Sequence, residues 1–86
     1  MNTTYKVVAQ NCDTPRITVE VEGNRFAAAE YAFLLRKAFR QVDVLNNETG
    51  EVMMNFYVSD EWFAAILSEA ECIALLQEKI NENRAR

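Results

Sequence analysis

Alternating apolar and polar residues mark two strands at the start of the chain. Residues 17–22 alternate Ile and Val with Thr and Glu, the period-two pattern of a strand with one buried side. Residues 5–10 repeat this alternation, and the loop between the two segments contains a proline. We therefore predict a β-hairpin over residues 5–22, with Gly23 ending its second strand.

A helical pattern follows the first hairpin. Asn24 is a residue type that caps helix N-termini, and the segment after it is rich in helix formers and contains neither Gly nor Pro. We predict a helix over residues 25–40. At 100° per residue its apolar side chains share one broad face that would cover the sheet. They are Ala27, Ala28, Tyr31, Leu34, Leu35, Ala38 and Phe39.

A second hairpin is predicted over residues 42–58, around a turn containing Gly50. Glycine suits the left-handed position of such a turn. With a loop over residues 48–50, Val44 falls opposite Met54 and Val42 opposite Phe56, and a slip by one residue would bring a charged side chain into the core. One side of this hairpin is then entirely apolar. It carries Val42, Val44, Val52, Met54, Phe56 and Val58.

The C-terminal third predicts helix with an interruption near Ser68. Ser59 is a candidate cap for a short helix through about Leu67. Ser68 and Glu71 have the spacing of a capping box, which indicates that the helix breaks and restarts there and runs to about Asn83. Residues 83–86 are expected to fray.

These elements predict a single α+β domain over residues 1–86. Their order is ββαββα, with a four-stranded, mainly antiparallel sheet and helices packed on one of its faces. The composition fits a folded globule, since 50% of the residues are hydrophobic and only two are Gly. The order of the strands in the sheet stays open, because a hairpin–helix–hairpin chain allows more than one arrangement.

Residues for catalysis are scarce. The chain has no His, and its two cysteines, Cys12 and Cys72, are far apart and lack basic neighbours that would activate a thiol. We expect Cys72 to pack in or beside the core. No phosphate loop or metal-ligand spacing occurs, so we predict no enzyme, no cofactor and no metal. Without a long apolar run or a signal segment, we expect a cytoplasmic protein that does not enter membranes.

The outer face of the second hairpin is more apolar than a solvent-exposed sheet face needs to be. It carries Leu45, Met53 and Tyr57, and Trp62 follows nearby in the sequence. Met and aromatic side chains are typical of interface centres, so we predict these four as partner-binding anchors, with a second copy as the partner. The alternative is that the C-terminal helical region covers this face as a third layer.

The predicted first helix is basic, although the whole chain has a formal charge of −4. Its four basic residues against Glu30 give +3, which leaves −7 for the rest of the chain. We predict Phe33, Arg36, Lys37 and Arg40 as a secondary contact for an acidic partner, unless this face is simply solvated.

The sequence therefore predicts a non-catalytic protein-interaction or regulatory module, homodimeric through the outer sheet face. One alternative is a binder of single-stranded nucleic acid that uses Phe26 and Phe33 beside the basic residues, although the net acidity disfavours it. Another is an acidic protein that mimics nucleic acid and inhibits a DNA-binding protein.

Overall fold

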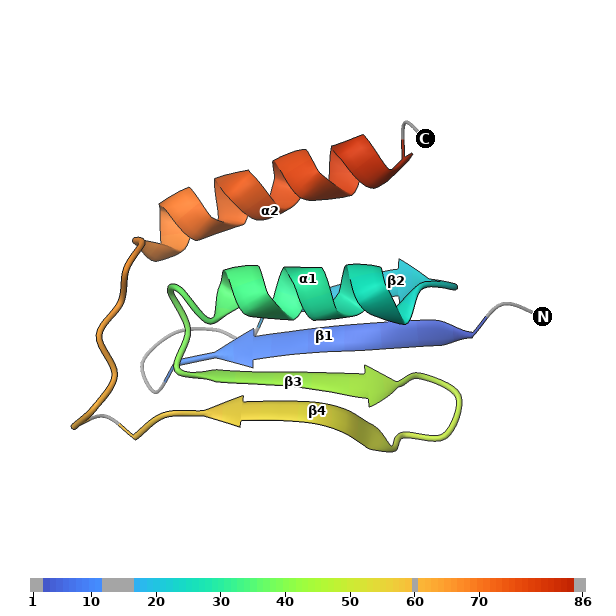
Figure 1. Cartoon of the computed structure of the whole chain (residues 1–86), viewed down its shortest axis with the longest axis horizontal. Helices are drawn as coiled ribbons and strands as arrows, with labels where there is room; N and C mark the ends of the chain where they lie inside the picture. The colour runs from blue at the N-terminus through green and yellow to red at the C-terminus, as the bar shows by residue number, and fades with distance from the viewer. Residues whose placement is uncertain (1–2, 12–16, 60, 85–86) are drawn as a thin grey trace.

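The protein is a four-stranded antiparallel sheet with two helices, which confirms the predicted α+β class and the ββαββα order (Figure 1). The computed structural model describes residues 3–11, 17–59 and 61–84. The strands lie in the order β2-β1-β3-β4, so the two hairpins meet through β1 and β3. The elements are β1 (Thr4–Gln10), β2 (Ile17–Glu22), α1 (Arg25–Leu35), β3 (Gln41–Asn46), β4 (Val52–Tyr57) and α2 (Glu69–Arg84).

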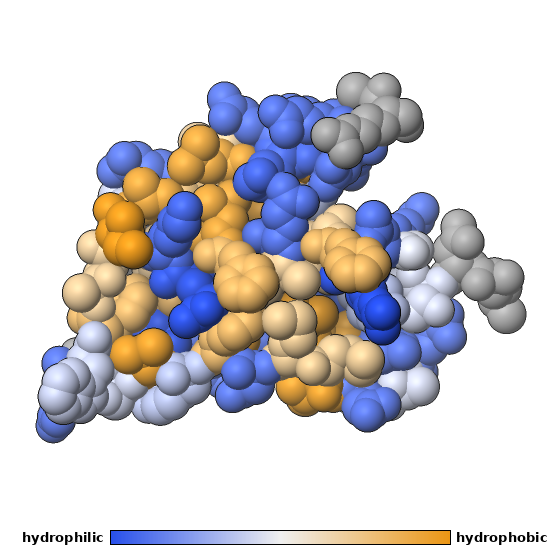
Figure 2. Space-filling view, viewed as in Figure 1, coloured by the Kyte–Doolittle hydropathy of each residue, from blue (hydrophilic) through white to orange (hydrophobic). Residues whose placement is uncertain are grey.

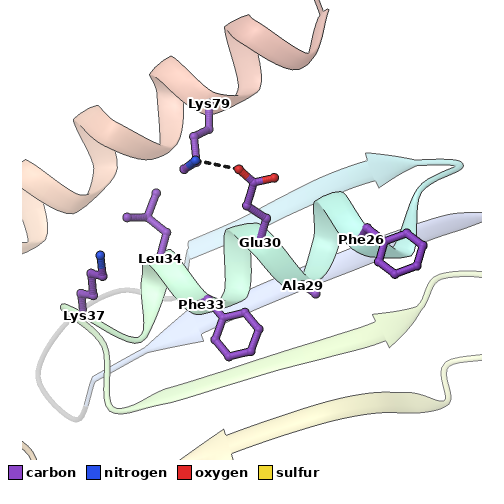
Figure 3. A pocket seen from close by; sticks show the side chains of 7 residues that line it. All are labelled: Phe26, Ala29, Glu30, Phe33, Leu34, Lys37 and Lys79. Atoms are coloured by element: carbon purple, nitrogen blue, oxygen red, sulfur yellow. Dashed lines mark hydrogen bonds and ion pairs between the residues drawn. The ribbon is translucent and has the colours of Figure 1, made fainter.

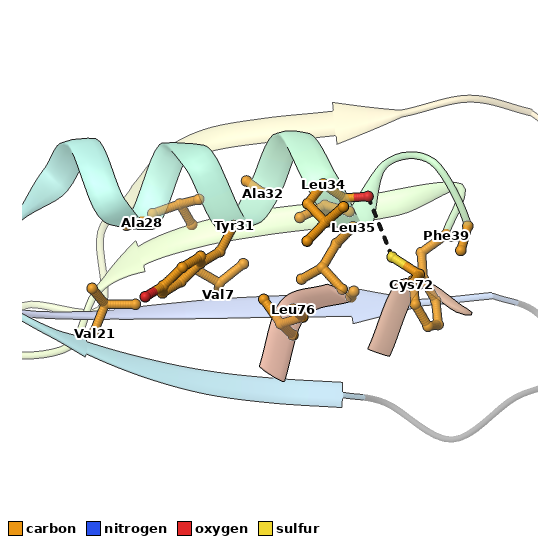
Figure 4. Packing of buried hydrophobic residues seen from close by; sticks show 14 residues of the cluster. Val7, Val21, Ala28, Tyr31, Ala32, Leu34, Leu35, Phe39, Cys72 and Leu76 are labelled. Atoms are coloured by element: carbon orange, nitrogen blue, oxygen red, sulfur yellow. Dashed lines mark hydrogen bonds between the residues drawn. The ribbon is translucent and has the colours of Figure 1, made fainter. Parts of the chain in front are cut away.

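The core lies between one face of the sheet and the two helices. Helix α1 packs on the sheet, and α2 packs on α1 on the side toward β2, away from β4 (Figure 1). Cys72 and Leu76 of α2 join the buried cluster, and Cys72 Sγ donates to Leu34 O at 3.3 Å (Figure 4). The prediction that Cys72 packs in the core is confirmed. Because α2 lies on the β2 side, the side of α1 toward β4 remains open.

Helix α1 begins where the sequence predicts and ends earlier. The side chain of Asn24 accepts hydrogen bonds from the first turn, which confirms it as the N-cap. The predicted end at Arg40 is wrong, because the helix ends at Leu35. Leu35 O accepts from the backbone N–H of both Ala38 and Phe39, which closes the helix in a turn. This turn buries Phe39 and lets β3 begin at residue 41.

The predicted register of the second hairpin is confirmed. Val44 pairs with Met54 and Val42 with Phe56, so the apolar side chains on this side of the hairpin face α1. Gly50 has a φ of 75°, the left-handed conformation that the turn requires. Its N–H donates to Asn46 O at 2.7 Å and closes the turn.

A bulge changes the side on which one predicted core residue lies. The register shifts between Val44 and Leu45, so that Leu45 pairs with Val52 and Met53 is the extra residue of β4. The placement of Val52 in the core is therefore wrong, and its side chain is 53% exposed.

The predicted short helix before Ser68 is also wrong. Ser59 O accepts from the N–H groups of Trp62 and Phe63, which forms a single turn. The backbone N–H groups of Ile66 and Leu67 then donate to the carbonyl of Lys37, beyond the end of α1. These tertiary hydrogen bonds hold Ile66 and Leu67 in a bend beside the end of α1, where local propensity favours helix. We call residues 61–67 the connecting arm.

The capping box at the start of α2 is confirmed. Glu71 N donates to Ser68 Oγ at 3.1 Å, and Ser68 N donates back to Glu71 Oε1 at 3.4 Å. Near the other end, Asn83 donates to Tyr31 Oη at 2.6 Å. Residues 85–86 of the predicted frayed end, like Cys12, lie outside the described residues. Neither helix of the described chain has the length and apolarity needed to cross a membrane.

Candidate protein interface

Helix α1 is apolar on two opposite sides. Its inner side is buried against the sheet and α2, while Phe26 and Phe33 on its outer side are 73% and 52% exposed. Among its 11 residues only Arg25 and Glu30 carry charge. Figure 3 shows both phenylalanine rings pointing away from α2, on the open side of the helix. A helix that is apolar on opposite sides is normally covered on both, so the outer side of α1 lacks a partner among the described residues.

Two aromatic rings and a guanidinium group form the centre of this open side. The ring of Phe33 lies 5.5 Å from that of Phe56, which projects from β4. The guanidinium carbon of Arg36 lies 5.8 Å from the Phe33 ring centre and 4.3 Å from that of Phe56. Stacking on the rings fixes the Arg36 cation at the surface while leaving its N–H edges able to bind an anion.

The connecting arm forms one wall of a hollow beside these rings. The hollow has a volume of about 380 Å³ and lies between the end of α1, the end of β4 and the arm. Trp62 and Ile66 of the arm are 80% and 77% exposed. The lining of the hollow combines apolar groups with the cationic side chains of Arg36, Lys37 and Arg40. Among the described residues, no carboxylate lines this hollow. The lining residues are Phe33, Arg36, Lys37, Phe39, Arg40, Phe56, Val58, Trp62, Phe63, Ala64 and Ile66.

A second, shallower hollow continues along α1 toward its N-terminus. Phe26, Ala29 and Phe33 lie on one side of it, and the pair formed by Glu30 and Lys79 lies on the other (Figure 3). Lys79 Nζ lies 2.6 Å from Glu30 Oε1, and this hydrogen bond and the carboxylate charge raise the pKa of Lys79. Figure 2 shows apolar side chains running over α1 toward the connecting arm, with hydrophilic side chains among them.

We define the α1 face as the exposed and half-buried apolar and cationic groups around these two hollows. Its members are Phe26, Ala29, Phe33, Arg36, Phe56, Trp62 and Ile66. Within the described part of the chain, Arg36 and Lys37 form no ion pair with a carboxylate. The α1 face is therefore an apolar surface with cationic groups along its edge.

The anchors predicted on the outer sheet face do not lie together. Leu45 and Tyr57 are on that face near opposite ends of the β3–β4 ladder, because Leu45 pairs with Val52 and Tyr57 with Gln41. Met53 lies in the bulge near Leu45. Tyr57 also has the guanidinium carbon of Arg40 5.8 Å from its ring centre.

A chain of polar contacts crosses the outer face between these groups. Gln10 Nε2 donates to Gln41 Oε1 at 3.0 Å, and Gln41 Nε2 lies 3.4 Å from Asp43 Oδ2. Asn55 Nδ2 donates to the other oxygen of Asp43. These contacts divide the outer face, so its apolar groups do not form one continuous patch. Neither helix covers this face, because both pack on the opposite one.

Trp62, the fourth predicted anchor, lies on the α1 face instead. There it lines the same hollow as Phe33, Arg36, Lys37 and Arg40, the residues predicted as a secondary charged contact. The structure therefore brings five of the eight predicted residues together around one hollow and leaves Leu45, Met53 and Tyr57 outside its lining.

Phe56 and Ile66 were not predicted as site residues. Alternation along β4 assigns Phe56 to the core, and it is only half-buried because α1 stops short of covering β4. Ile66 was expected inside a helix. The seven-residue spacing of Phe26 and Phe33, opposite the buried stripe of α1, was the signal available in the sequence.

The described residues offer little for covalent chemistry. No group of three or more His, Cys, Asp or Glu side chains among them is close enough to hold a metal ion. Burial raises the pKa of the Cys72 thiol, an effect that the nearby charge of Lys37 offsets only in part.

Comparisons with known proteins return no relationship: no family model, no curated protein and no solved structure matches this chain.

Proposed function

We propose that this protein is a non-catalytic protein-interaction module that binds its partner through the α1 face. The observation that carries the proposal is that α1 is apolar on its outer side as well as its inner side, with Phe26 73% exposed. A buried Cys72 thiol, with no disulfide, is consistent with a module that acts in the cytoplasm.

The composition of the α1 face resembles that of the binding centre of a protein interface. Tryptophan and arginine are enriched among residues that dominate binding energy, and Trp62 and Arg36 lie at the same hollow. Each large apolar side chain contributes about 1.5–3 kcal/mol when fully buried. Trp62 and Phe26 are mostly exposed, so most of this free energy is still available to a partner.

The charges at the α1 face favour an acidic partner surface. Arg36 and Lys37 lie at the same hollow, and neither is neutralised by a carboxylate of the described chain. Complementary charges raise association rates and select among partners. A partner bound to this face through these contacts would have its own surface covered, and in this way the protein could regulate that partner.

Capture of a partner with matched variants tests the proposal. Tagged wild-type protein would be incubated with an extract of the cells that express it, crosslinked, and its attached proteins identified by mass spectrometry. We expect the double variant Phe26→Ala, Trp62→Ala to capture at least tenfold less partner protein than wild type, because it removes two interface anchors. Ile73→Ala is the control, since Ile73 is 44% exposed but belongs to α2. Equal capture by all three proteins would refute the α1 face as the binding surface.

Binding of single-stranded nucleic acid is a second candidate, favoured by the contact of the Arg36 guanidinium with the neighbouring rings of Phe33 and Phe56. Aromatic rings beside cations are the elements that hold unpaired bases. The formal charge of −4 weighs against it, because phosphate neutralisation drives such binding. Fluorescence anisotropy with a labelled oligo-dT at low salt separates the candidates. Binding that Phe33→Ala abolishes would assign the face to nucleic acid.

A further inference from the structure

We propose that the α1 face binds an acidic amphipathic helix of another protein, which lies beside α1 with its N-terminal end at Arg36 and Lys37. The apolar side of the bound helix covers Phe26 and Phe33, and carboxylates in its first turn meet the two cations. The inference rests on the proposed function, because it requires that the α1 face binds protein, and it adds the structure and the charge of the bound segment.

The helices of this protein cover only part of the sheet. The backbone of α1 packs against β1, β2 and β3 but not against β4, and α2 packs on the side of α1 toward β2 (Figure 1). Phe56 of β4 is therefore only half-buried, and Phe33, whose ring lies 5.5 Å from it, is 52% exposed. The strip beside α1, from Phe26 past Phe33 to the connecting arm, is open. A further helix placed there, about 8–10 Å from α1, would complete the helical layer.

The exposed side chains of α1 have the spacing that an apolar helix face matches. Phe26 and Phe33 lie seven residues apart, about 10 Å along the axis, and the small Ala29 leaves a depression between them. An amphipathic helix repeats its apolar side chains every three or four residues, so these fit between the two rings and onto Ala29. Trp62 and Ile66 of the connecting arm, which are 80% and 77% exposed, border the other end of the strip.

An added strand fits this site less well than a helix does. β4 is an edge strand, and an extended peptide can pair with an exposed sheet edge. The bulge at Met53 interrupts the ladder of β4, and bulges are a common means of preventing further pairing. A strand beside β4 would also lie in the plane of the sheet and leave Phe26 uncovered. A helix beside α1 covers Phe26.

Charge selects an acidic segment and sets its direction. Arg36 and Lys37 follow the last residue of α1 and line the hollow at this end of the strip. Stacking of Arg36 on Phe56, at 4.3 Å from the ring centre, leaves its N–H edges available for a carboxylate. Carboxylates are most favourable in the first turn of a helix, so the bound helix runs antiparallel to α1. Arg25, at the start of α1, then lies near its C-terminal end, where a cation is favourable.

Three synthetic peptides test the structure and the charge of the bound segment. The first is a fluorescein-labelled helical probe of about 14 residues, roughly 20 Å of helix, with leucines at helical spacing and glutamates in its first turn. The second carries lysines in place of these glutamates. The third has the composition of the first in strict apolar–polar alternation, the pattern of a strand. By fluorescence anisotropy, we expect the first probe to bind at least tenfold more tightly than either of the others.

Variants of the protein test the site and the direction of the bound helix. Arg36→Gln should weaken binding of the acidic helical probe at least fivefold, whereas Arg84→Gln, which removes the same charge from the last turn of α2, should have less than a twofold effect. Phe26→Asp should abolish binding with an unchanged circular dichroism spectrum, since Phe26 is too exposed to support the fold. Energy transfer from Trp62, the single tryptophan, should be stronger to a dansyl group on the N-terminus of the probe than to one on its C-terminus.

Several results would overturn the inference. Equal binding of the three probes, or tighter binding of the lysine or the alternating probe, would do so, and so would stronger energy transfer to the C-terminal dansyl group. If no probe binds while the α1 face still captures a protein from the extract, the helical partner is refuted and the proposed function stands. If binding and capture are both absent, both proposals fail.

Discussion

The side chain of Asn11 joins the end of β1 to the start of α2, because its Nδ2 donates to Glu69 Oε1 at 2.9 Å. The same amide group donates to Ala38 O at 3.0 Å and accepts from Arg40 N at 2.8 Å. One side chain thus fixes the turn after α1 and the position at which α2 begins. This turn carries Arg36 and Lys37, so Asn11 also positions the cationic edge of the α1 face.

Replacing Asn11 should destabilise the protein more than an ordinary surface substitution. Asn11→Ala removes three part-buried hydrogen bonds, and at about 0.5–1.5 kcal/mol each the free energy of unfolding should fall by about 2–3 kcal/mol. Urea unfolding followed by circular dichroism measures this change. Thr18→Ala on the exposed side of β2 is the control and should change stability by less than about 0.5 kcal/mol. A similar small loss for Asn11→Ala would contradict the bridging role.

The capping box should make Ser68 more important than Ser59. Ser68→Ala removes the hydroxyl that accepts from Glu71 N and should cost about 1 kcal/mol. Ser59→Ala is a matched control, because the contacts of Ser59 at its turn come from its backbone carbonyl. Chemical denaturation of both variants and of wild type measures these changes in the free energy of unfolding. Equal losses would mean that residues 59–67 form the helix that the sequence predicts.

The buried thiol of Cys72 should be unreactive and should make stability depend on pH. Burial raises its pKa in the folded state, so the unfolded chain ionises first as pH increases. This contribution to stability is complete below the pKa of the unfolded thiol, about 8.5, and is lost as pH rises toward the folded value. Between pH 7 and 10 the urea midpoint of wild type should therefore fall more than that of Cys72→Ala. A Cys12→Ser protein should react with a thiol reagent only after unfolding, and fast labelling under native conditions would contradict this.

Trp62 is the single tryptophan of the chain and should report occupancy of the α1 face. In the isolated chain it is 80% exposed, so acrylamide should quench its fluorescence efficiently at high dilution. Binding of a partner protein should reduce quenching and shift the emission to the blue, because the indole leaves water. Phe26→Asp should remain fully quenched at every partner concentration. Emission that is independent of the partner would place Trp62 outside the interface.

The structural features that depend on contacts between residues near each other in the chain were predicted correctly from the sequence. The first hairpin, the Asn24 cap, the pairing of Val44 with Met54 and the Ser68 capping box all follow from contacts within a few residues or across one turn. The errors occur where a distant contact overrides local preference. The arm is not helical because two of its N–H groups donate to Lys37 O, and α1 ends early because the turn that follows it is hydrogen-bonded to Asn11.

The sequence by itself determined the class of fold, the buried stripe of α1 and the unusual number of apolar groups outside it, because these depend on periodicity along one element. Only the tertiary structure decided where those groups meet. It placed α2 on the β2 side of α1, left Phe33 and Phe56 uncovered, and moved Trp62 away from Leu45 and Met53. The physical reason is that a surface patch is assembled from side chains of separate elements, and their relative positions depend on packing that no local pattern records.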